Sequence, residues 1–221
     1  MSHDPPLSDP PPLSAASPLS HAPPPHHAAP PGYDPPRPAG RLLLTPEDTE
    51  APARVRRLRR LGLGERVEPA LDVFAGRLAE VTGAPYAMVN FLVTNGQFFA
   101  GLHIPLFPPV VRADGTGPEF GRVHPRDHGF CPHVAARRRA LVLEDVRDYP
   151  RFAGNPVVDE FGIRSYLGAP LIDSTGTVLG TVGAADVQPR PWGKAGLETI
   201  KSTAAELVGR IERAADDGLP L

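Results

Sequence analysis

This chain begins with a proline-rich stretch that a compact fold could not readily absorb. Sixteen of its 30 prolines lie within residues 1–52, and each proline fixes φ and removes a backbone hydrogen-bond donor. The same stretch has few large apolar side chains whose burial could offset the entropy lost on ordering. We therefore expect residues 1–52 to be a disordered tail with local polyproline II character, and residues 53–216 to form the folded domain.

The remaining composition excludes several classes of protein. The net charge of −2 gives no basic excess, so we expect no nucleic-acid partner. The single cysteine, Cys131, excludes an intramolecular disulfide framework and a zinc site made of several thiolates. The chain has no secretory signal pattern and no run of about 18 apolar residues, so we expect a cytoplasmic protein with no membrane association.

Hydrophobic periodicity predicts helices at both ends of the domain. A short basic helix should cover residues 54–61, with its arginines on solvated faces. A longer amphipathic helix should cover residues 66–82, and residues 192–215 should form a third. The apolar stripe of the second helix is expected to consist of Val67, Leu71, Phe74, Leu78 and Val81.

The segments between these helices read as strands and loops. Residues 86–93 and 97–104 flank the turn residues Thr94-Asn95-Gly96 and predict a β-hairpin. Residues 105–125 contain five prolines and no periodicity, so they form a long loop and a candidate lid. A short helix, a strand and an irregular segment with one or two helical turns should follow. Residues 164–173 and 177–187 predict a second hairpin.

This order of elements is typical of an α+β fold. It predicts a mainly antiparallel sheet of about five or six strands with amphipathic helices packed on one face. Glycines at positions 168, 180 and 183 in the second hairpin indicate bulges or close approach of a neighbouring backbone. The other face should carry the irregular segments, and a pocket between them and the sheet is where a small molecule would bind.

Several segments between about Arg54 and Asp216 form a recognisable pattern when they are taken in order. They are RLRRLGLGERVEPALDVFAGRLAEVTGAPYAMVNFLV, NGQFFAG, RDHGFCPHV, LEDVRDYPRFAGNPVV, RSYLGAPLID and TVLGTV. Together they resemble a GAF domain of the bacterial sensory kind. The resemblance implies a free-standing regulatory protein in signal transduction, without an output domain of its own, that binds a small molecule or senses redox state. It further implies a protein that is not an enzyme and that forms a homodimer through its terminal helices.

The resemblance assigns neither a ligand nor a cofactor. The chain lacks the complete Asn-Lys-Phe-Asp-Glu signature of cyclic-nucleotide-binding relatives, and the surroundings of Cys131 do not match those of a bilin attachment cysteine. It also inserts HIPLFPPVVRADGTGPEFGRVHP before the short helix, which alters the mouth of the pocket.

The candidate ligand-binding residues combine polar groups in or near the strands with groups around the short helix. A polar side chain that faces a pocket would orient a ligand, although each could equally face water or cap a turn. The candidates are Asn90, Phe98, Phe130, Cys131, His133, Asp145, Arg164, Tyr166 and Asp186.

Three other interpretations remain open. Cys131 could be a buried structural cysteine, or the nucleophile of a thiol enzyme similar to free methionine sulfoxide reductases, which share this fold. The segment HPRDHGFCPH concentrates metal-ligand residue types, and His124 and His128 are four apart, as on one helical face. Pro125 and Gly129 disfavour a helix there, so we predict no metal site. The proline-rich tail could make the protein an adaptor that recruits a signalling partner.

Overall fold

The computed structural model describes residues 1, 45–94, 96–106, 120–219 and 221. Most of the expected tail and most of the candidate lid therefore lie outside the described residues. Residues 40–221 form one unit that holds every helix and strand described below. Among the helices in the described ranges, none has the length and apolar character needed to cross a membrane.

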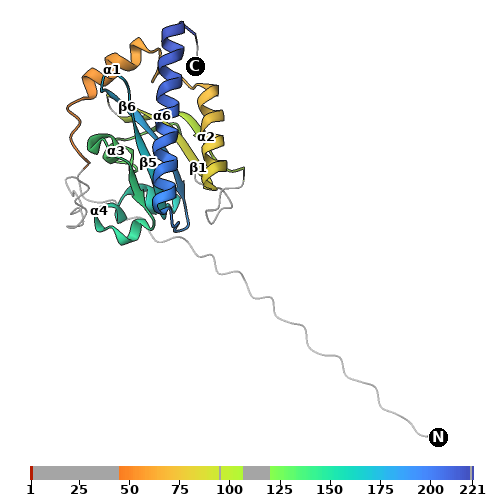
Figure 1. The fold of residues 1–221 in the computed structure, drawn as a ribbon. Helices are drawn as coiled ribbons and strands as arrows, with labels where there is room; N and C mark the ends of the chain where they lie inside the picture. The colour runs from red at the N-terminus through yellow and green to blue at the C-terminus, as the bar shows by residue number, and fades with distance from the viewer. Residues whose placement is uncertain (2–44, 95, 107–119, 220) are drawn as a thin grey trace. The chain divides into compact units, whose positions relative to one another are not determined.

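A six-stranded sheet forms the centre of the domain, in the order β3-β2-β1-β6-β5-β4, and each neighbouring pair of strands is antiparallel. The α+β prediction of a mainly antiparallel sheet is confirmed (Figure 1). The strands are β1 Tyr86–Val93, β2 Gly96–His103, β3 Val123–His124, β4 Leu141–Leu143, β5 Ser165–Ile172 and β6 Val178–Asp186.

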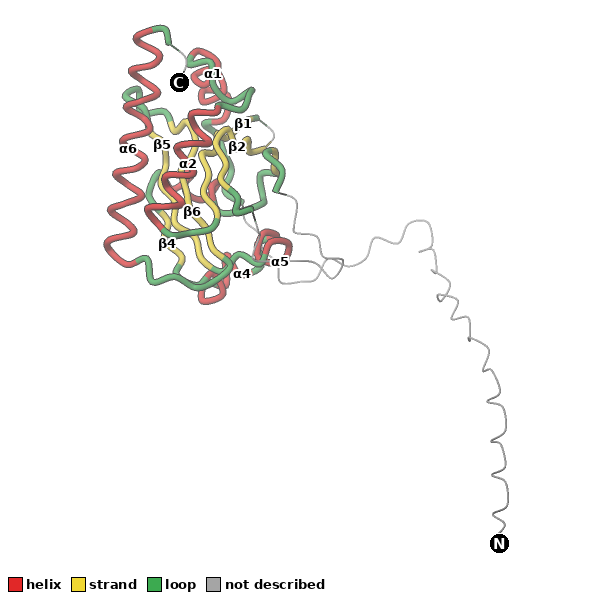
Figure 2. Tube along the Cα trace, turned by 90° about the vertical axis from the view of Figure 1, so that its right-hand side faces the viewer, coloured by secondary structure: helices red, strands yellow, loops and turns green. Residues whose placement is uncertain are grey.

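The helices divide between the two faces of this sheet. On one face, α2 (Pro69–Thr82) and α6 (Gly193–Asp217) run side by side, and Arg77 of α2 pairs with Glu206 of α6 at 3.5 Å (Figure 1). The other face carries the short elements α3 (Cys131–Arg137), α4 (Pro150–Ala153) and α5 (Pro156–Phe161) with a 3-10 turn at Val146–Asp148. Figure 2 shows α4 and α5 at one end of the strands.

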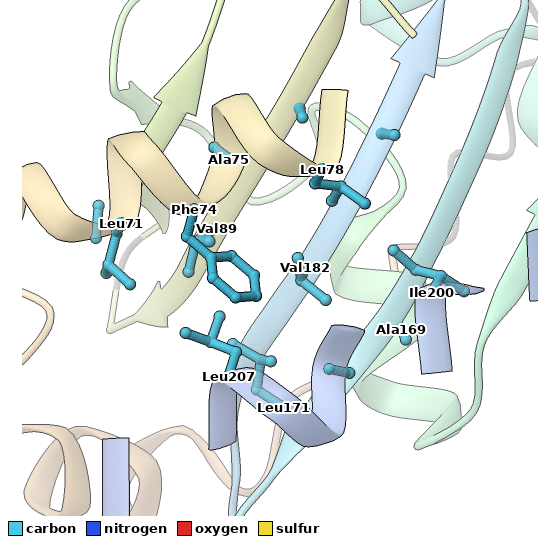
Figure 3. Packing of buried hydrophobic residues seen from close by; sticks show 14 of the residues in the cluster. Leu71, Phe74, Ala75, Leu78, Val89, Ala169, Leu171, Val182, Ile200 and Leu207 are labelled. Atoms are coloured by element: carbon cyan, nitrogen blue, oxygen red, sulfur yellow. The ribbon is translucent and has the colours of Figure 1, made fainter. Parts of the chain in front are cut away.

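The face covered by α2 and α6 is a continuous apolar core. Phe74 and Leu78 of α2 meet Val89 of β1, Val182 of β6 and Leu207 of α6 (Figure 3). These side chains are buried, and burial of apolar surface of this kind supplies most of the favourable free energy of folding. This core fixes the positions of the strands, and the opposite face of the sheet lines the cavity described below.

The expected stripe of α2 needs a correction at its two ends. Val67 precedes the helix and is 42% exposed, and Val81 is 64% exposed. The helix instead buries Ala75 and Ala79. It lies so close to β2 that a Cβ atom at Gly101 would come within 2.3 Å of a backbone oxygen of the helix, and small residues suit that distance.

The basic helix α1 (Ala51–Arg60) differs from expectation at one arginine. Arg54 is only 2% exposed, because its Nε donates to the Val178 carbonyl at 2.5 Å and its guanidinium binds the Asp48 carboxylate. A buried guanidinium needs such partners, since an unpaired buried charge is costly. Arg126 also donates to the Pro46 carbonyl at 2.7 Å, so residues 46–54 are attached to the domain.

The second hairpin shows the close approaches that its glycines indicated. A Cβ atom at Gly180 would lie 2.0 Å from the Asn90 carbonyl oxygen of the neighbouring strand. The strand register is irregular between Val89 and Asn90 of β1 and between Leu171 and Ile172 of β5. Such irregularities change the direction of side chains, and both lie within strands that form the floor of the cavity described next.

Candidate functional site

A cavity of about 50 Å³ lies on the face of the sheet opposite α2 and α6. Strands β1, β2, β5 and β6 form its floor, and α5 together with the turn that leads into α3 forms its roof. The described residues that line it are Tyr86, Met88, Gln97, Phe99, Phe120, His124, His128, Gly129, Phe130, Cys131, Val157, Phe161, Ile163, Tyr166 and Ala185.

Tyr166 of β5 forms part of the floor because two glycines make room for it. A Cβ atom at Gly168 would lie 2.2 Å from the Tyr166 hydroxyl, and one at Gly183 would lie 3.1 Å from it. The ring therefore lies along the sheet, and its hydroxyl reaches Cys131 Sγ at 3.4 Å. Burial, and then the contact with Cys131, raise the pKa of Tyr166 well above its usual value of 10, so the hydroxyl keeps its proton.

Tyr86 of β1 is a second tyrosine that lines the cavity. Its side chain is fully buried, and its hydroxyl has no hydrogen-bond partner among the described residues. Burial and the nearby charge of Asp186 raise the pKa of Tyr86 to about 12, so this hydroxyl also stays protonated at neutral pH. A buried donor without a partner is costly and uncommon in folded proteins, which marks Tyr86 as a candidate ligand contact.

Aromatic rings close one side of the cavity. Phe120 stacks on Phe161 with ring centroids 4.1 Å apart and lies 4.8 Å from the ring of Tyr86. The ring of His124 lies 4.8 Å from that of Phe99. Burial lowers the pKa of His124 below 6.5, so its imidazole is mainly neutral at pH 7. This side of the cavity is therefore apolar and uncharged.

Two buried amide side chains hold the roof in place. Gln97 of β2 donates to the carbonyls of Pro125 at 2.8 Å and of His128 at 2.6 Å, and it accepts from Asn90 at 3.0 Å. These bonds fix the turn over the floor and satisfy the buried amide of Gln97, whereas Asn90 Oδ1 has no partner among the described residues.

Asn155 performs the same task from the side of α5. It caps that helix by accepting from the Val157 amide, and it exchanges hydrogen bonds with Gly129 of the turn at 2.8 and 3.0 Å. The expectation that Asn155 is scaffold agrees with these contacts. Its contacts extend beyond its own loop, because its hydrogen bonds to Gly129 connect α5 to the turn that precedes α3.

The structure brings three of the nine predicted ligand-binding residues to the cavity: Phe130, Cys131 and Tyr166. Asn90 lies behind Gln97 and does not line it. The other polar candidates are engaged in ion pairs. Arg164 Nε binds Asp145 at 3.0 Å, and Asp186 binds Arg190 at 2.5 Å. Ion pairing satisfies these charges, so they do not project into the cavity.

Phe98 and His133 point elsewhere. Phe98 packs against the core on the α2 and α6 face, because its neighbour Phe99 takes the cavity side of β2. His133 of α3 packs edge-on against Phe152 with ring centroids 5.0 Å apart. Burial, and then the charges of Arg151 and Arg137, lower its pKa to about 4, so His133 is neutral at pH 7.

Sequence reasoning missed most of the wall. Tyr86 and Met88 lie in a strand with buried residues on both faces, so no polar alternation distinguishes the cavity side. Phe120 belongs to the long insertion, which has no periodicity. Gln97 carried a usable signal, because a glutamine that follows a tight turn inside an apolar hairpin requires buried partners.

The metal-ligand residue types of HPRDHGFCPH diverge in space. His128 contacts Asp127 at 3.0 Å and Glu160 at 3.4 Å, whereas Cys131 turns to Tyr166 and His133 to Phe152. Within the described ranges, no group of three or more histidine, cysteine, aspartate or glutamate side chains could hold a metal ion.

Comparison with known proteins places this chain in one family. The family model of the GAF domain matches residues 66–211, and the chain therefore belongs to the GAF domain family. GAF domains are regulatory modules of signal transduction, and this coarse role applies to the chain.

One curated relative is the cyclic di-GMP phosphodiesterase PA2567 of Pseudomonas aeruginosa, which is 30% identical over 157 residues. The match covers 67% of this chain but only 24% of the relative, so the chain spans about a quarter of that protein's length.

Solved structures share the fold at low sequence identity. A free methionine-R-sulfoxide reductase from Neisseria meningitidis in complex with its substrate is 17% identical, with a TM-score of 0.51 over 76% of this chain and 89% of that one. The GAF domain of a phosphoenolpyruvate-protein phosphotransferase from Coxiella burnetii is also 17% identical, with a TM-score of 0.51 over 76% of this chain and 96% of that one.

Proposed function

We propose that this GAF domain is a regulatory module that binds a small uncharged molecule in the cavity and passes the change to a signalling partner. The observation that carries the proposal is the enclosed, mainly apolar cavity, and one of the residues that line it is Tyr86, whose buried hydroxyl has no partner among the described residues. A ligand that accepts a hydrogen bond from this hydroxyl would remove the cost of leaving it unpaired.

The charge of the wall favours an uncharged ligand. No lysine, arginine, aspartate or glutamate is among the described residues that line the cavity. A phosphate or carboxylate placed there would lose its hydration without gaining a cation, which is strongly unfavourable. Apolar rings with a few hydroxyl and imidazole groups instead suit a small molecule that has one or two hydrogen-bond acceptors.

The route from the cavity to a partner is part of the same proposal. The roof turn carries Arg126, which binds the Pro46 carbonyl and lies 3.8 Å from Asp48. A ligand that shifts this turn would therefore also shift the segment before α1.

We propose that the protein acts in the cytoplasm as a homodimer through its terminal helices and that it is not an enzyme.

Cys131 supports a second candidate function, although the carboxylate of free methionine sulfoxide would meet no lysine or arginine among the described residues that line the cavity. Its sulfur lies in the wall of the cavity, where a bound substrate could be attacked, as a thiol enzyme of the free methionine sulfoxide reductase type requires. Reductant-dependent turnover of free methionine sulfoxide that disappears in Cys131→Ser would favour this candidate. Unchanged ligand binding by Cys131→Ser without any turnover would favour the regulatory module.

The binding proposal is tested by native mass spectrometry of the full chain purified without added ligands, followed by release of bound molecules under denaturing conditions. We expect a low-mass uncharged compound with the wild type and its loss in Gly168→Ala, because the added Cβ must displace Tyr166 from the floor. Gly76→Ala is the matched control, since its Cβ would meet only His103 Nδ1 at an ordinary distance of 3.6 Å. A compound retained equally by all three proteins would contradict binding in this cavity.

A further inference from the structure

His128 lies between two carboxylates in the roof of the cavity. Its Nδ1 atom is 3.0 Å from Oδ1 of Asp127, the preceding residue of the same turn, and its Nε2 atom is 3.4 Å from Oε1 of Glu160 in α5. The imidazole also lines the cavity, so it connects the two segments of the roof at the site itself. Its side chain is 21% exposed and both carboxylates are exposed, so the ring can exchange protons with solvent.

The contact with Glu160 depends on the protons of the ring. A neutral imidazole carries one N–H, and the hydrogen-bond contact of Nδ1 with Asp127 places it on Nδ1. Nε2 then presents a lone pair to the Glu160 carboxylate, which has only acceptor atoms, and this contact is repulsive. An imidazolium carries a proton on both nitrogens, so the same contact becomes a charge-assisted attraction.

We propose that His128 is a pH-dependent latch of the cavity, which binds Glu160 and holds α5 over the site when Nε2 is protonated and releases α5 when that proton is lost. The proton moves between Nε2 and solvent water, and no other bond changes. The closed roof holds this proton more tightly than an open roof does, so a fall in pH favours the closed state. As control of ligand entry the latch rests on the proposed function, because it requires that the cavity takes up a ligand.

The other ionisable groups around His128 do not form a comparable contact. The titratable residues that line the cavity with it are Tyr86, His124, Cys131 and Tyr166. Both tyrosines stay protonated at neutral pH. Burial, and to a smaller extent the charge of His128, lower the pKa of His124, so His124 of β3 stays mainly neutral. In the same turn, Arg126 is engaged by the Pro46 carbonyl and Asp48, and α5 carries one further acid, Asp159.

Two further contacts hold α5 at any pH in this range. Asn155 exchanges hydrogen bonds with Gly129 at 2.8 and 3.0 Å, and the ring of Phe161 stacks on that of Phe120. None of these groups titrates, so the latch adds to a roof that is already attached. Ion pairs between exposed groups contribute modestly, and we therefore expect the population of the open roof to change by a few fold.

The test is hydrogen–deuterium exchange of the full-length protein without ligand at about pH 5.5 and about pH 8, on either side of the range in which histidine changes charge. Protection factors, which correct for the pH dependence of intrinsic exchange, are read on peptides that cover residues 155–163. We expect protection there to be about twofold to fivefold higher at the lower pH. Peptides from β6, at the centre of the sheet, should show no such rise.

Matched variants assign the effect to the latch. Glu160→Gln should remove the rise in protection, because a neutral amide can donate to the neutral ring or accept from the charged one. His128→Gln should remove it as well, since glutamine does not titrate. Glu65→Gln, which takes a carboxylate from an exposed ion pair with Arg59, should keep the full rise.

Either of two outcomes would overturn the proposal. One is protection of residues 155–163 that does not rise at the lower pH in the wild type. The other is a rise of equal size in Glu160→Gln and His128→Gln, which would assign it to other groups. The exchange experiment uses no ligand, so its failure leaves capture of a compound in the cavity untouched. An empty cavity in the capture experiment would in turn leave the measured latch intact, so the two failures are distinguishable.

Discussion

The same strands form both faces of the sheet, but one face is tightly packed and the other encloses a cavity. On the α2 and α6 side, large aliphatic side chains interlock in a continuous apolar core (Figure 3). On the other side, glycines, bulged strands and buried polar groups surround a cavity. Alternate residues of β1 serve both sides, since Val89 joins the core and Met88 lines the cavity. The difference indicates that one face supplies stability and the other accepts imperfect packing for a site.

The largest expected effect is on the packed face. Leu207→Ala removes a fully buried side chain of α6 and leaves a hole against α2 and the sheet. We expect a loss of about 2–5 kcal/mol in the free energy of unfolding, as for other buried leucines. Urea denaturation of the full chain measures it. Ligand capture by the fraction that remains folded should be unchanged, and a selective loss of capture would show that the two faces are not separable.

On the cavity face, Gly168→Ala should reduce the free energy of unfolding less than Leu207→Ala does, but it should reduce ligand binding more. The new Cβ must displace Tyr166, and overpacking of this kind costs about 1–3 kcal/mol. The contact between Tyr166 and Cys131 should be lost as well. Gly76→Ala, inside α2, should instead stabilise the protein by about 0.5–1 kcal/mol, because alanine favours a helix. Equal effects of the two substitutions in thermal denaturation would remove the basis for this contrast.

A pH effect should arise from His133, which is buried neutral on the cavity face. Its pKa is about 4 in the folded protein and 6.5 as the ordinary value. Between these values the unfolded chain binds more protons, so stability should fall as pH drops from 6.5 to 4. We expect a loss of about 1–2 kcal/mol across this window, after allowance for partial solvation of the ring.

His133→Gln checks the assignment of this pH effect. Glutamine does not titrate, so the stability of the variant should vary less between pH 6.5 and 4 than that of the wild type. Urea denaturation at several pH values measures the difference. A pH dependence as steep in His133→Gln as in the wild type would assign the effect to other groups.

The smallest expected effect has the opposite sign. Tyr86→Phe removes a buried hydroxyl that has no partner among the described residues, so the ligand-free protein should gain up to about 1 kcal/mol of stability. Tyr149→Phe, at an exposed position, should change stability by no more than about 0.5 kcal/mol. Thermal denaturation of ligand-free samples gives both values. A clear loss of stability in Tyr86→Phe would mean that the hydroxyl is already satisfied in the wild type.

The sequence predicted the arrangement of elements well because each has a local signal. Alternation, turn residues and apolar stripes located the two hairpins and the long terminal helix, and the glycines at 180 and 183 indicated close backbone approaches that the structure contains. At Gly168 the close neighbour is instead the side chain of Tyr166. Arg54 was harder to foresee, because its burial depends on Asp48 and on a carbonyl of a strand more than 100 residues later.

The site was less accessible to prediction. Whether Phe98 or Phe99 faces the cavity depends on strand register, which shifts at the bulge between Val89 and Asn90. In the sequence, charged residues such as Asp145 and Arg164 are plausible ligand contacts. The structure shows that these two residues instead bind each other as an ion pair. Phe130, Cys131 and Tyr166 reach the cavity, and the other six candidates do not line it.

Capture of small molecules by matched variants tests the central claim most directly. Wild type, Tyr86→Phe and Tyr149→Phe would be incubated with the same metabolite extract and separated from free compounds, and the bound molecules would be released and identified by mass. We predict that the wild type and Tyr149→Phe enrich the same small uncharged compound and that Tyr86→Phe enriches much less of it. Equal enrichment by Tyr86→Phe, or enrichment of a phosphorylated compound, would contradict the account of the cavity as a site for an uncharged ligand.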